Sequence, residues 1–296
     1  MKEAVMKTVP AAAAGLNQRH RKIIRKILWY VLVCLLAVVF IIPVYWMVLM
    51  SFKPLSEMYV IPIPWFPRPP FQISNYIEAW EGYPFPTYFK NTILVVVLTT
   101  VGNIFSATLT AYGFARIKFP GRNILFVILI SSMMLPFQVK TIPLFQMYKS
   151  VGWLDTLLPL IVPTFFAAAT PFFVFLMRQF YLSIPEDLSA AARIDGCGSF
   201  RIFRSIFLPL TKPAIVTVAL FSFMDNWNDF FLPLIFINSN ENKTLSLGLA
   251  GMTGQYVSDW HIIMAASVIT VLPCVIVFLF AQKHFVEGIA VSGLKG

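Results

Sequence analysis

The sequence predicts an all-α integral membrane protein with six transmembrane helices and a charged loop between the fourth and the fifth. Two observations lead to this fold class. Of the 296 residues, 58% are apolar and only 12% are charged, whereas soluble domains carry about twice that charged fraction. Uncharged runs also recur along the chain, and about 20 helical residues suffice to cross a hydrocarbon core about 30 Å thick.

The candidate spans begin close to the N-terminus. Residues 27–50 are uncharged over 24 positions, a run too long for the apolar core of a signal peptide, so we expect an anchor that stays. Prolines in and near the later runs predict kinked helices whose freed carbonyl groups bond to neighbouring helices. The run 123–147 also contains one charged residue, Lys140. The five further spans are expected at 89–114, 123–147, 157–177, 212–237 and 261–282.

The distribution of basic residues predicts which side of the membrane each loop occupies. With six spans, 17 Lys and Arg residues fall on one side and five on the other. Because cytoplasmic loops are enriched in Lys and Arg, we expect a cytoplasmic N-terminal segment (1–26), a transmembrane domain (27–282) with a cytoplasmic loop at 183–213, and a cytoplasmic tail (283–296). This asymmetry accounts for the net charge of +10 and removes the case for nucleic-acid binding.

The loop 183–213 is predicted to begin with a helix. Ser183 and Glu186 have the spacing of a capping box, and Gly196 and Gly198 are expected to end the helix, since glycine adopts the left-handed conformation of a C-terminal cap. Such a segment either lies on the lipid surface or contacts another protein. Lipid-binding faces use bulky apolar side chains, so the small face expected here, Leu188, Ala191 and Ala192, favours a protein partner.

A polar cluster interrupts the expected fifth span. Polar groups at such depth are costly and usually face the bundle interior or an aqueous cavity. The two acidic residues are four positions apart and would share one helix face. Two interpretations stay open, namely a lining of the transport pathway and interhelical hydrogen bonds that stabilise the bundle. The cluster consists of Asp225, Asn226, Trp227, Asn228 and Asp229.

The sequence carries no signature of catalysis. The phosphate loop GxxxxGK[ST], the dinucleotide motif GxGxxG and the hydrolase motifs HExxH and GxSxG are all absent. The cysteines Cys34, Cys197 and Cys274 are far apart and have neither a disulfide framework nor metal-ligand spacing. The chain is therefore not expected to be an enzyme or to bind a cofactor or metal, and energy for transport must come from an ion gradient or another subunit.

Several motifs in order resemble one family of membrane proteins. The segment ARIDGCGSFRIFRSIFLPLTKP resembles the cytoplasmic signature of binding-protein-dependent ATP-binding-cassette import permeases. The stretches AYGFARIKFPGR, MMLPFQVKTIPLF, WNDFFLPL and the tail GIAVSGLKG are similar to the smaller maltose-type permease subunit of sugar importers. The likeness spans nearly the whole chain. Within the signature segment, the matching residues are Ala191, Ala192, Asp195, Gly196, Ile206, Leu208 and Pro209.

The resemblance implies a type I importer in the bacterial inner membrane. A second, homologous permease subunit would complete the pore, two cytoplasmic ATPase subunits would carry ATP and Mg, and an extracytoplasmic binding protein would deliver a sugar or oligosaccharide, neutral or acidic. The tail residues Gly288, Gly293, Lys295 and Gly296 would also contact the ATPase. The loop 183–213 would contain the coupling helix, whose ATPase-facing residues are Glu186, Asp187, Ala190, Ala191, Ala192, Arg193, Asp195, Gly196, Cys197 and Phe200.

One position departs from the family pattern. The family's leading glutamate falls at Ala190, so Glu186, Asp187 or Arg193 would have to supply any charged contact with the ATPase. Three other functions compete with sugar import: a proton-coupled secondary transporter that uses Asp225 or Asp229, an import permease for a non-sugar solute such as a glycerol phosphate ester, and a non-transporting scaffold. Co-purification with an ATPase separates import driven by ATP from the first and the last.

Overall fold

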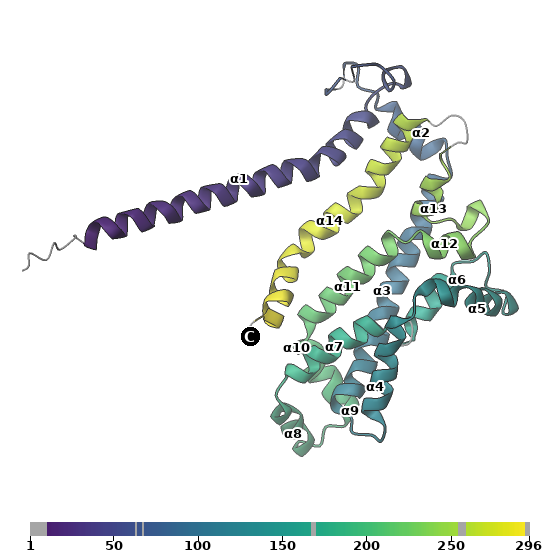
Figure 1. The fold of residues 1–296 in the computed structure, drawn as a ribbon. Coiled ribbons are helices and arrows are strands. Elements are labelled where there is room, and N and C mark those ends of the chain that lie inside the picture. The colour runs from purple at the N-terminus through teal and green to yellow at the C-terminus, as the bar shows by residue number, and fades with distance from the viewer. Residues whose placement is uncertain (1–10, 63, 67, 167–169, 254–258, 294–296) are drawn as a thin grey trace, which may run out of the picture.

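The computed structural model describes residues 11–62, 64–66, 68–166, 170–253 and 259–293, and this part of the chain is helical, without strands. Three helices are long, continuous and apolar enough to cross a membrane (Figure 1): α1 (Ala11–Ser51), α3 (Phe85–Arg116) and α14 (Trp260–Gly293). They correspond to the first, second and sixth predicted spans. The predicted tail at 283–296 begins inside α14, which continues as helix to Gly293.

The three middle predicted spans are each divided in the structure. The third consists of α4 (Arg122–Ser131) with the 3-10 turn η2 (Ser132–Met134), followed by α5 (Phe137–Ser150) at an angle of 100°. The fourth consists of α6 (Leu158–Ile161), η3 (Val162–Phe165) and α7 (Pro171–Ser183). Prolines stand in the first turns of α6, η3 and α7, where the missing N–H costs no helical hydrogen bond.

The fifth predicted span, 212–237, is not one helix. It consists of α11 (Lys212–Trp227) and α12 (Phe231–Phe236). Polar side chains satisfy the backbone on both sides of the break: Asn228 Nδ2 donates to Met224 O at 2.8 Å, and Asp229 Oδ1 accepts from Leu232 N at 3.2 Å. The number of spans stays a prediction, because length and composition alone support three crossing helices, or five if two bent helix pairs also cross.

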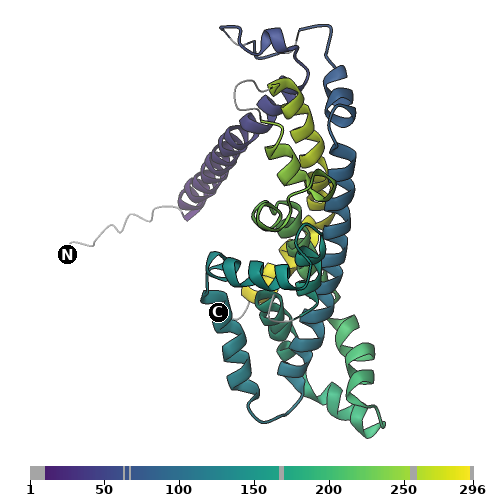
Figure 2. The ribbon, with the colours of Figure 1, turned by 90° about the vertical axis from the view of Figure 1, so that its right-hand side faces the viewer.

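Shorter elements complete the chain. On the outer side as predicted from charge are η1 (Leu55–Glu57), α2 (Ser74–Glu81), η6 (Asn240–Asn242) and α13 (Leu245–Ala250). The loop 183–213 contains α8 (Glu186–Ile194), α9 (Ser199–Ile202), the π-turn η5 (Phe203–Phe207) and α10 (Leu208–Leu210). Figures 1 and 2 place α8 and α9 at the end of the molecule opposite α2.

Three apolar clusters contain residues of α3: one joins α3 to α2 and α14, and the other two divide the rest of the body into two halves. Toward the end that carries α8, Ala111 and Tyr112 of α3 pack with α7, α11 and the loop 183–213. Toward the other end, Val95 of α3 packs with α5, α6 and α12. In contrast, α1 projects from this body (Figure 1), and its residues 21–45 are exposed. Of residues 21–51 of this helix, only Leu49 to Ser51 are buried.

Candidate functional site

The N-terminus of α8 differs from the prediction. Ser183 does not form a capping box, because it is the last residue of α7 and its Oγ donates to Phe180 O at 2.8 Å. Ile184 and Pro185 are extended, and α8 begins at Glu186 without a side-chain cap. The proline supplies the start instead: its ring fixes φ near the helical value and removes an N–H that the first turn leaves unpaired.

The C-terminus of α8 has the predicted glycine cap. Gly196 has φ +78°, Cys197 N donates to Ala192 O at 2.9 Å and Gly196 N donates to Arg193 O at 3.0 Å. This pair of bonds is a Schellman motif, which needs a left-handed residue at the position of Gly196. Gly198 has another role than predicted, since its extended backbone starts α9. The turn between α8 and α9 therefore has one defined geometry.

The face of α8 predicted to meet a partner is exposed except for Ala192. Ser189 and Ala192 are buried, whereas Leu188 and Ala191 are exposed. The tip of the loop also carries a bulky apolar residue that sequence reasoning missed, Ile194, which is 87% exposed. Of the ten residues predicted to face an ATPase, Ala192 is buried and Cys197 half-buried. The other eight are exposed: Glu186, Asp187, Ala190, Ala191, Arg193, Asp195, Gly196 and Phe200.

The loop 183–213 is firmly attached to the body. Phe203 and Phe207 are buried, with ring centroids 5.1 and 5.2 Å from that of Tyr112 on α3, whose hydroxyl donates to Ser199 O at 3.1 Å. Arg116, at the end of α3, donates to the carbonyls of Tyr181 and Ile184. Its guanidinium lies 4.9 Å from the Phe207 ring centroid, within the range of a cation–π contact.

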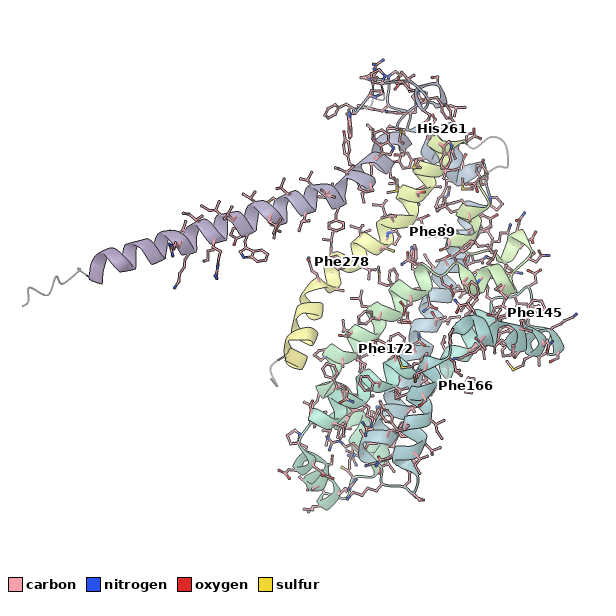
Figure 3. The ribbon with its side chains drawn as sticks, in the orientation of Figure 1. Phe89, Phe145, Phe166, Phe172, His261 and Phe278 are labelled. Carbon is pink, nitrogen blue, oxygen red and sulfur yellow. The ribbon has the colours of Figure 1, made fainter. Side chains whose placement is uncertain are left out.

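A cavity of about 710 Å³ lies between the two halves of the body. Its walls are mainly aromatic and aliphatic, and Figure 3 labels two of the lining rings, Phe166 and Phe172. This size and this mixture of apolar walls with few polar groups are typical of small-molecule sites. The polar and charged side chains in the lining are Asn103, Ser132, Lys140, Thr164, Thr170, Asp225 and Asn226.

The predicted polar cluster is divided between the cavity and the backbone. Asp225 and Asn226 line the cavity. Trp227 is buried, donates from Nε1 to Thr270 O of α14 at 3.1 Å and stacks on Phe223. Asn228 and Asp229 bond the backbone at the break between α11 and α12. Because α11 ends at Trp227, the two acidic residues do not share a helix face.

A polar connection between α3 and α11 was missed by sequence reasoning. Asn103 Nδ2 donates to Ser222 Oγ at 2.7 Å, and Ser222 Oγ donates to Thr100 Oγ1 at 3.2 Å. Asn226 Nδ2 donates to Ser222 O at 2.7 Å. Among the described residues, Asn103 Oδ1 has no hydrogen-bond partner although it is buried, and Asn103 lines the cavity. The signal available was Asn103 among Thr99, Thr100 and Ser106 in the second predicted span.

Lys140 also faces this cavity, from α5. Its Nζ donates to Ser132 O at 3.2 Å, across the bend between η2 and α5.

The structure describes only part of the tail that was predicted to contact the ATPase. Gly288 and Gly293 belong to α14, whereas Lys295 and Gly296 lie outside the described residues. Within the described part of the chain, no group of three or more His, Cys, Asp or Glu residues is arranged to hold a metal ion.

Residues 104–291 match the family of binding-protein-dependent transport system inner membrane components. The chain belongs to this family. The match covers α4 to α14 almost completely and confirms the resemblance drawn from the motifs of the loop 183–213. With several apolar helices and membership of an inner membrane family, the permease is a multi-pass inner membrane protein.

Some relatives of the permease are named for the transport of saccharides. It is 34% identical over 270 residues to the arabinooligosaccharides transport system permease protein AraQ of Bacillus subtilis, which covers 88% of this chain and 93% of AraQ. It is 31% identical over 267 residues to the diacetylchitobiose uptake system permease protein NgcG of Streptomyces coelicolor, covering 88% and 86%. A bacterial importer of the acidic polysaccharide alginate has the same fold, with a TM-score of 0.79 at 24% identity over 88% of this chain and 96% of that one.

Proposed function

We propose that this chain is one of two permease subunits of an ATP-driven importer for a saccharide delivered by an external solute-binding protein. The observation that carries the proposal is the family match over residues 104–291, together with relatives named for arabinooligosaccharides and diacetylchitobiose. The permease pairs with a second, homologous subunit, and two ATPase subunits on the cytoplasmic side hold ATP and Mg. Both termini and the loop 183–213 lie in the cytoplasm, as the distribution of basic residues predicts.

The loop 183–213 is the ATPase contact in this proposal. Three properties suit it to that role: eight of the ten predicted residues are exposed, the Schellman motif gives the turn one geometry, and Phe203 and Phe207 fasten the loop to α3 and α7. The loop can transmit motion from the ATPase to the spans only if its own turn and its attachment to the body are both rigid. Packed interfaces then switch between discrete arrangements and do not deform gradually. Ile194 and Phe200, both exposed at the tip, supply the apolar contact surface. Exposed Glu186, Asp187 and Arg193 are available for charged contacts in place of the glutamate missing at Ala190.

The cavity is this subunit's contribution to the pathway. A saccharide presents hydroxyl groups and apolar ring faces, and the lining offers partners for both: Asp225, Asn226 and Asn103 for hydrogen bonds, and aromatic rings for the sugar faces. The cavity carries both a carboxylate and an ammonium group, Asp225 and Lys140. That balance suits neutral saccharides better than polyanions.

The test is purification followed by reconstitution. We expect tagged permease, isolated from membranes of its host, to carry a second permease and an ATPase with its own phosphate loop. Proteoliposomes of that complex should take up labelled arabinooligosaccharide or diacetylchitobiose only with ATP and the binding protein present. Uptake that needs no ATP and stops with a protonophore would establish the rival secondary transporter instead. Isolation without any ATPase would favour the scaffold.

A further inference from the structure

The divided spans group into two bodies on either side of the cavity. The outer body consists of α5, α6 and α12, whose Tyr148, Leu160 and Phe236 share one apolar cluster. The inner body consists of α4, α7, α11 and the loop 183–213, which share another. Each of spans three, four and five therefore has one part in each body, while α3 contributes to both. The cavity is lined from both sides, by Tyr148 and Phe236 of the outer body and by Phe172, Phe173 and Asp225 of the inner one.

One residue joins the loops of the outer body. Asp155, between α5 and α6, is linked to residues 236–242 by five hydrogen bonds. Its Oδ1 accepts from Asn238 N at 2.9 Å, Ser239 N at 2.8 Å and Ser239 Oγ at 2.9 Å. Its backbone N donates to Phe236 O at 2.8 Å, and its backbone O accepts from Asn242 Nδ2 at 2.6 Å. A carboxylate that accepts two backbone N–H groups forms the stronger, charge-assisted kind of hydrogen bond.

The backbone of Asp155 requires an explanation of its own. With φ +58° it is the single non-glycine residue at positive φ among those described, and aspartate tolerates this conformation better than most residues. Glycine would form a turn of this shape equally well, as Gly152 does three residues earlier with φ +71°. The carboxylate is what glycine lacks, and it is the carboxylate that reaches the other loop.

A second set of bonds ties the same loop to α3. Asn91 Nδ2 donates to Glu241 O at 2.8 Å and to Lys243 O at 3.0 Å, and Thr92 Oγ1 accepts from Leu245 N at 2.8 Å. Asn91 and Thr92 are buried. Residues 236–245 are thus held from α3 on one side and from Asp155 on the other. Without the Asp155 carboxylate, two bonds of the Asp155 backbone, to Phe236 O and from Asn242 Nδ2, would remain beside the apolar packing between α5, α6 and this loop.

We propose that Asp155 is a positioning residue for transport: it makes α5, α6 and α12 move as one outer body, against which the inner body with the loop 183–213 opens and closes the cavity. The proposal rests on the proposed function. The bend of 100° between η2 and α5 and the break between α11 and α12 are the joints. When the loop 183–213 moves, the inner wall of the cavity moves with it. This changes the opening of the cavity only if the outer wall, formed by α5, α6 and α12, keeps its shape.

Three substitutions separate the carboxylate from the turn. Asp155→Asn keeps an oxygen acceptor and tolerates positive φ, so we expect transport within about threefold of wild type. Asp155→Gly satisfies the backbone but removes all three Oδ1 bonds, and we expect transport to fall about tenfold while binding-protein-stimulated ATP hydrolysis continues. Thr156→Ala is the matched control, because it removes two bonds of the same loop that do not reach residues 236–242, Thr156 Oγ1 to Trp153 O and Leu158 N to Thr156 Oγ1, and should leave transport unchanged.

Cross-linking tests whether the joined loops stay together through the cycle. In a background with Cys34 and Cys274 replaced by serine, and with Cys197 kept because it belongs to the predicted ATPase contact, Asp155→Cys with Ser239→Cys should transport poorly until a short bis-methanethiosulfonate reagent joins the two thiols, and then recover. Wild-type-like transport by Asp155→Gly, or loss of transport on cross-linking, would overturn the proposal. Absence of ATP-dependent uptake in the wild-type complex would overturn the proposed function instead, so the two failures are distinguishable.

Discussion

The loop 183–213 and the polar cluster 225–229 looked equally distinctive in the sequence, but the structure treats them differently. The loop keeps nearly all of its predicted residues together on one exposed unit, ended by the Schellman motif at Gly196. The cluster is divided: Asp225 and Asn226 line the cavity, Trp227 packs against α14, and Asn228 and Asp229 bond the backbone.

The difference lies in what determines each arrangement. A helix cap is local, because the bonds that define it connect residues only a few positions apart. The orientation of a polar side chain inside a bundle depends on where its helix ends and on which neighbour offers a partner. An Asn or Asp in an apolar run has two uses, binding a ligand or satisfying a freed backbone group. Composition does not distinguish them.

Substitution of Gly196 should have the largest effect on the first region. Gly196→Trp forces a bulky residue into a left-handed conformation, at a cost of roughly 1–2 kcal/mol, and places it on the exposed face of the loop. We expect solute uptake to be nearly abolished while basal ATP hydrolysis persists, measured in proteoliposomes.

Gly152→Trp is the matched control for this change. Gly152 has φ +71°, and an added Cβ would meet nothing within 4 Å at either glycine. The control carries the same backbone strain on the side predicted to be extracytoplasmic and should retain coupled transport. If both variants lose uptake equally, strain rather than ATPase contact explains the result.

Substitutions in the cluster should separate its two uses. Asp225→Ala and Asn226→Ala remove polar groups from the cavity lining, and we expect each to lower saccharide uptake about tenfold, the equivalent of ~1.4 kcal/mol of lost interaction. The initial rate of uptake at low solute concentration is the measurement. Asp225→Asn keeps hydrogen bonding without charge and should retain most of the activity, whereas a proton-coupled transporter would lose it.

A smaller effect is expected at Asn228. Asn228→Ala removes one exposed bond to Met224 O, worth about 0.5–1.5 kcal/mol at most, and should leave uptake unchanged while lowering the thermal midpoint in detergent slightly. Loss of uptake comparable to that of Asp225→Ala would place Asn228 with the solute-binding group and remove the contrast within the cluster.

The smallest expected effect is a loss of thermal stability at acidic pH, and it depends on Asp155, which like Asn228 bonds to backbone groups. Hydrogen bonds from the backbone of Ser239 and then of Asn238 lower the pKa of the Asp155 carboxyl. A lowered pKa contributes stability that is present above the unfolded value, about pH 4, and is lost as the pH falls through the folded value. The thermal midpoint of the wild type should therefore drop more between pH 7 and pH 3.5 than that of Asp155→Asn. Equal drops would contradict this assignment.

Much of the fold was predictable from apolar runs. The first, second and sixth spans are uninterrupted in the sequence and continuous in the structure. The bend before α5 has a sequence signal, Pro136, and α7 begins at Pro171. The break after Trp227 has no proline or glycine, and the residues that stabilise it, Asn228 and Asp229, were expected either to line the pathway or to bond neighbouring helices. A break made by side-chain bonds cannot be told from a site by residue type.

Of the two candidate sites, one was predictable from the sequence and the other was not. The exposed coupling residues follow from a short, charged, glycine-ended segment. The cavity does not, because it forms where Lys140 of α5, Asn103 of α3 and Asp225 of α11 approach one another across more than a hundred positions of sequence. Asn103 was missed because an Asn among Thr and Ser residues in a span is equally typical of a helix-packing contact.

The arm formed by α1 has a practical consequence. It is held to the body by its last turns, and residues 27–45 present apolar side chains on every side. Its placement is therefore supported by whatever amphiphile or neighbouring chain surrounds it, and not by the fold of this subunit. Extraction conditions that strip bound lipid will displace α1 before they unfold the rest of the subunit. A purified preparation can therefore keep an intact cavity although α1 is no longer in its membrane position.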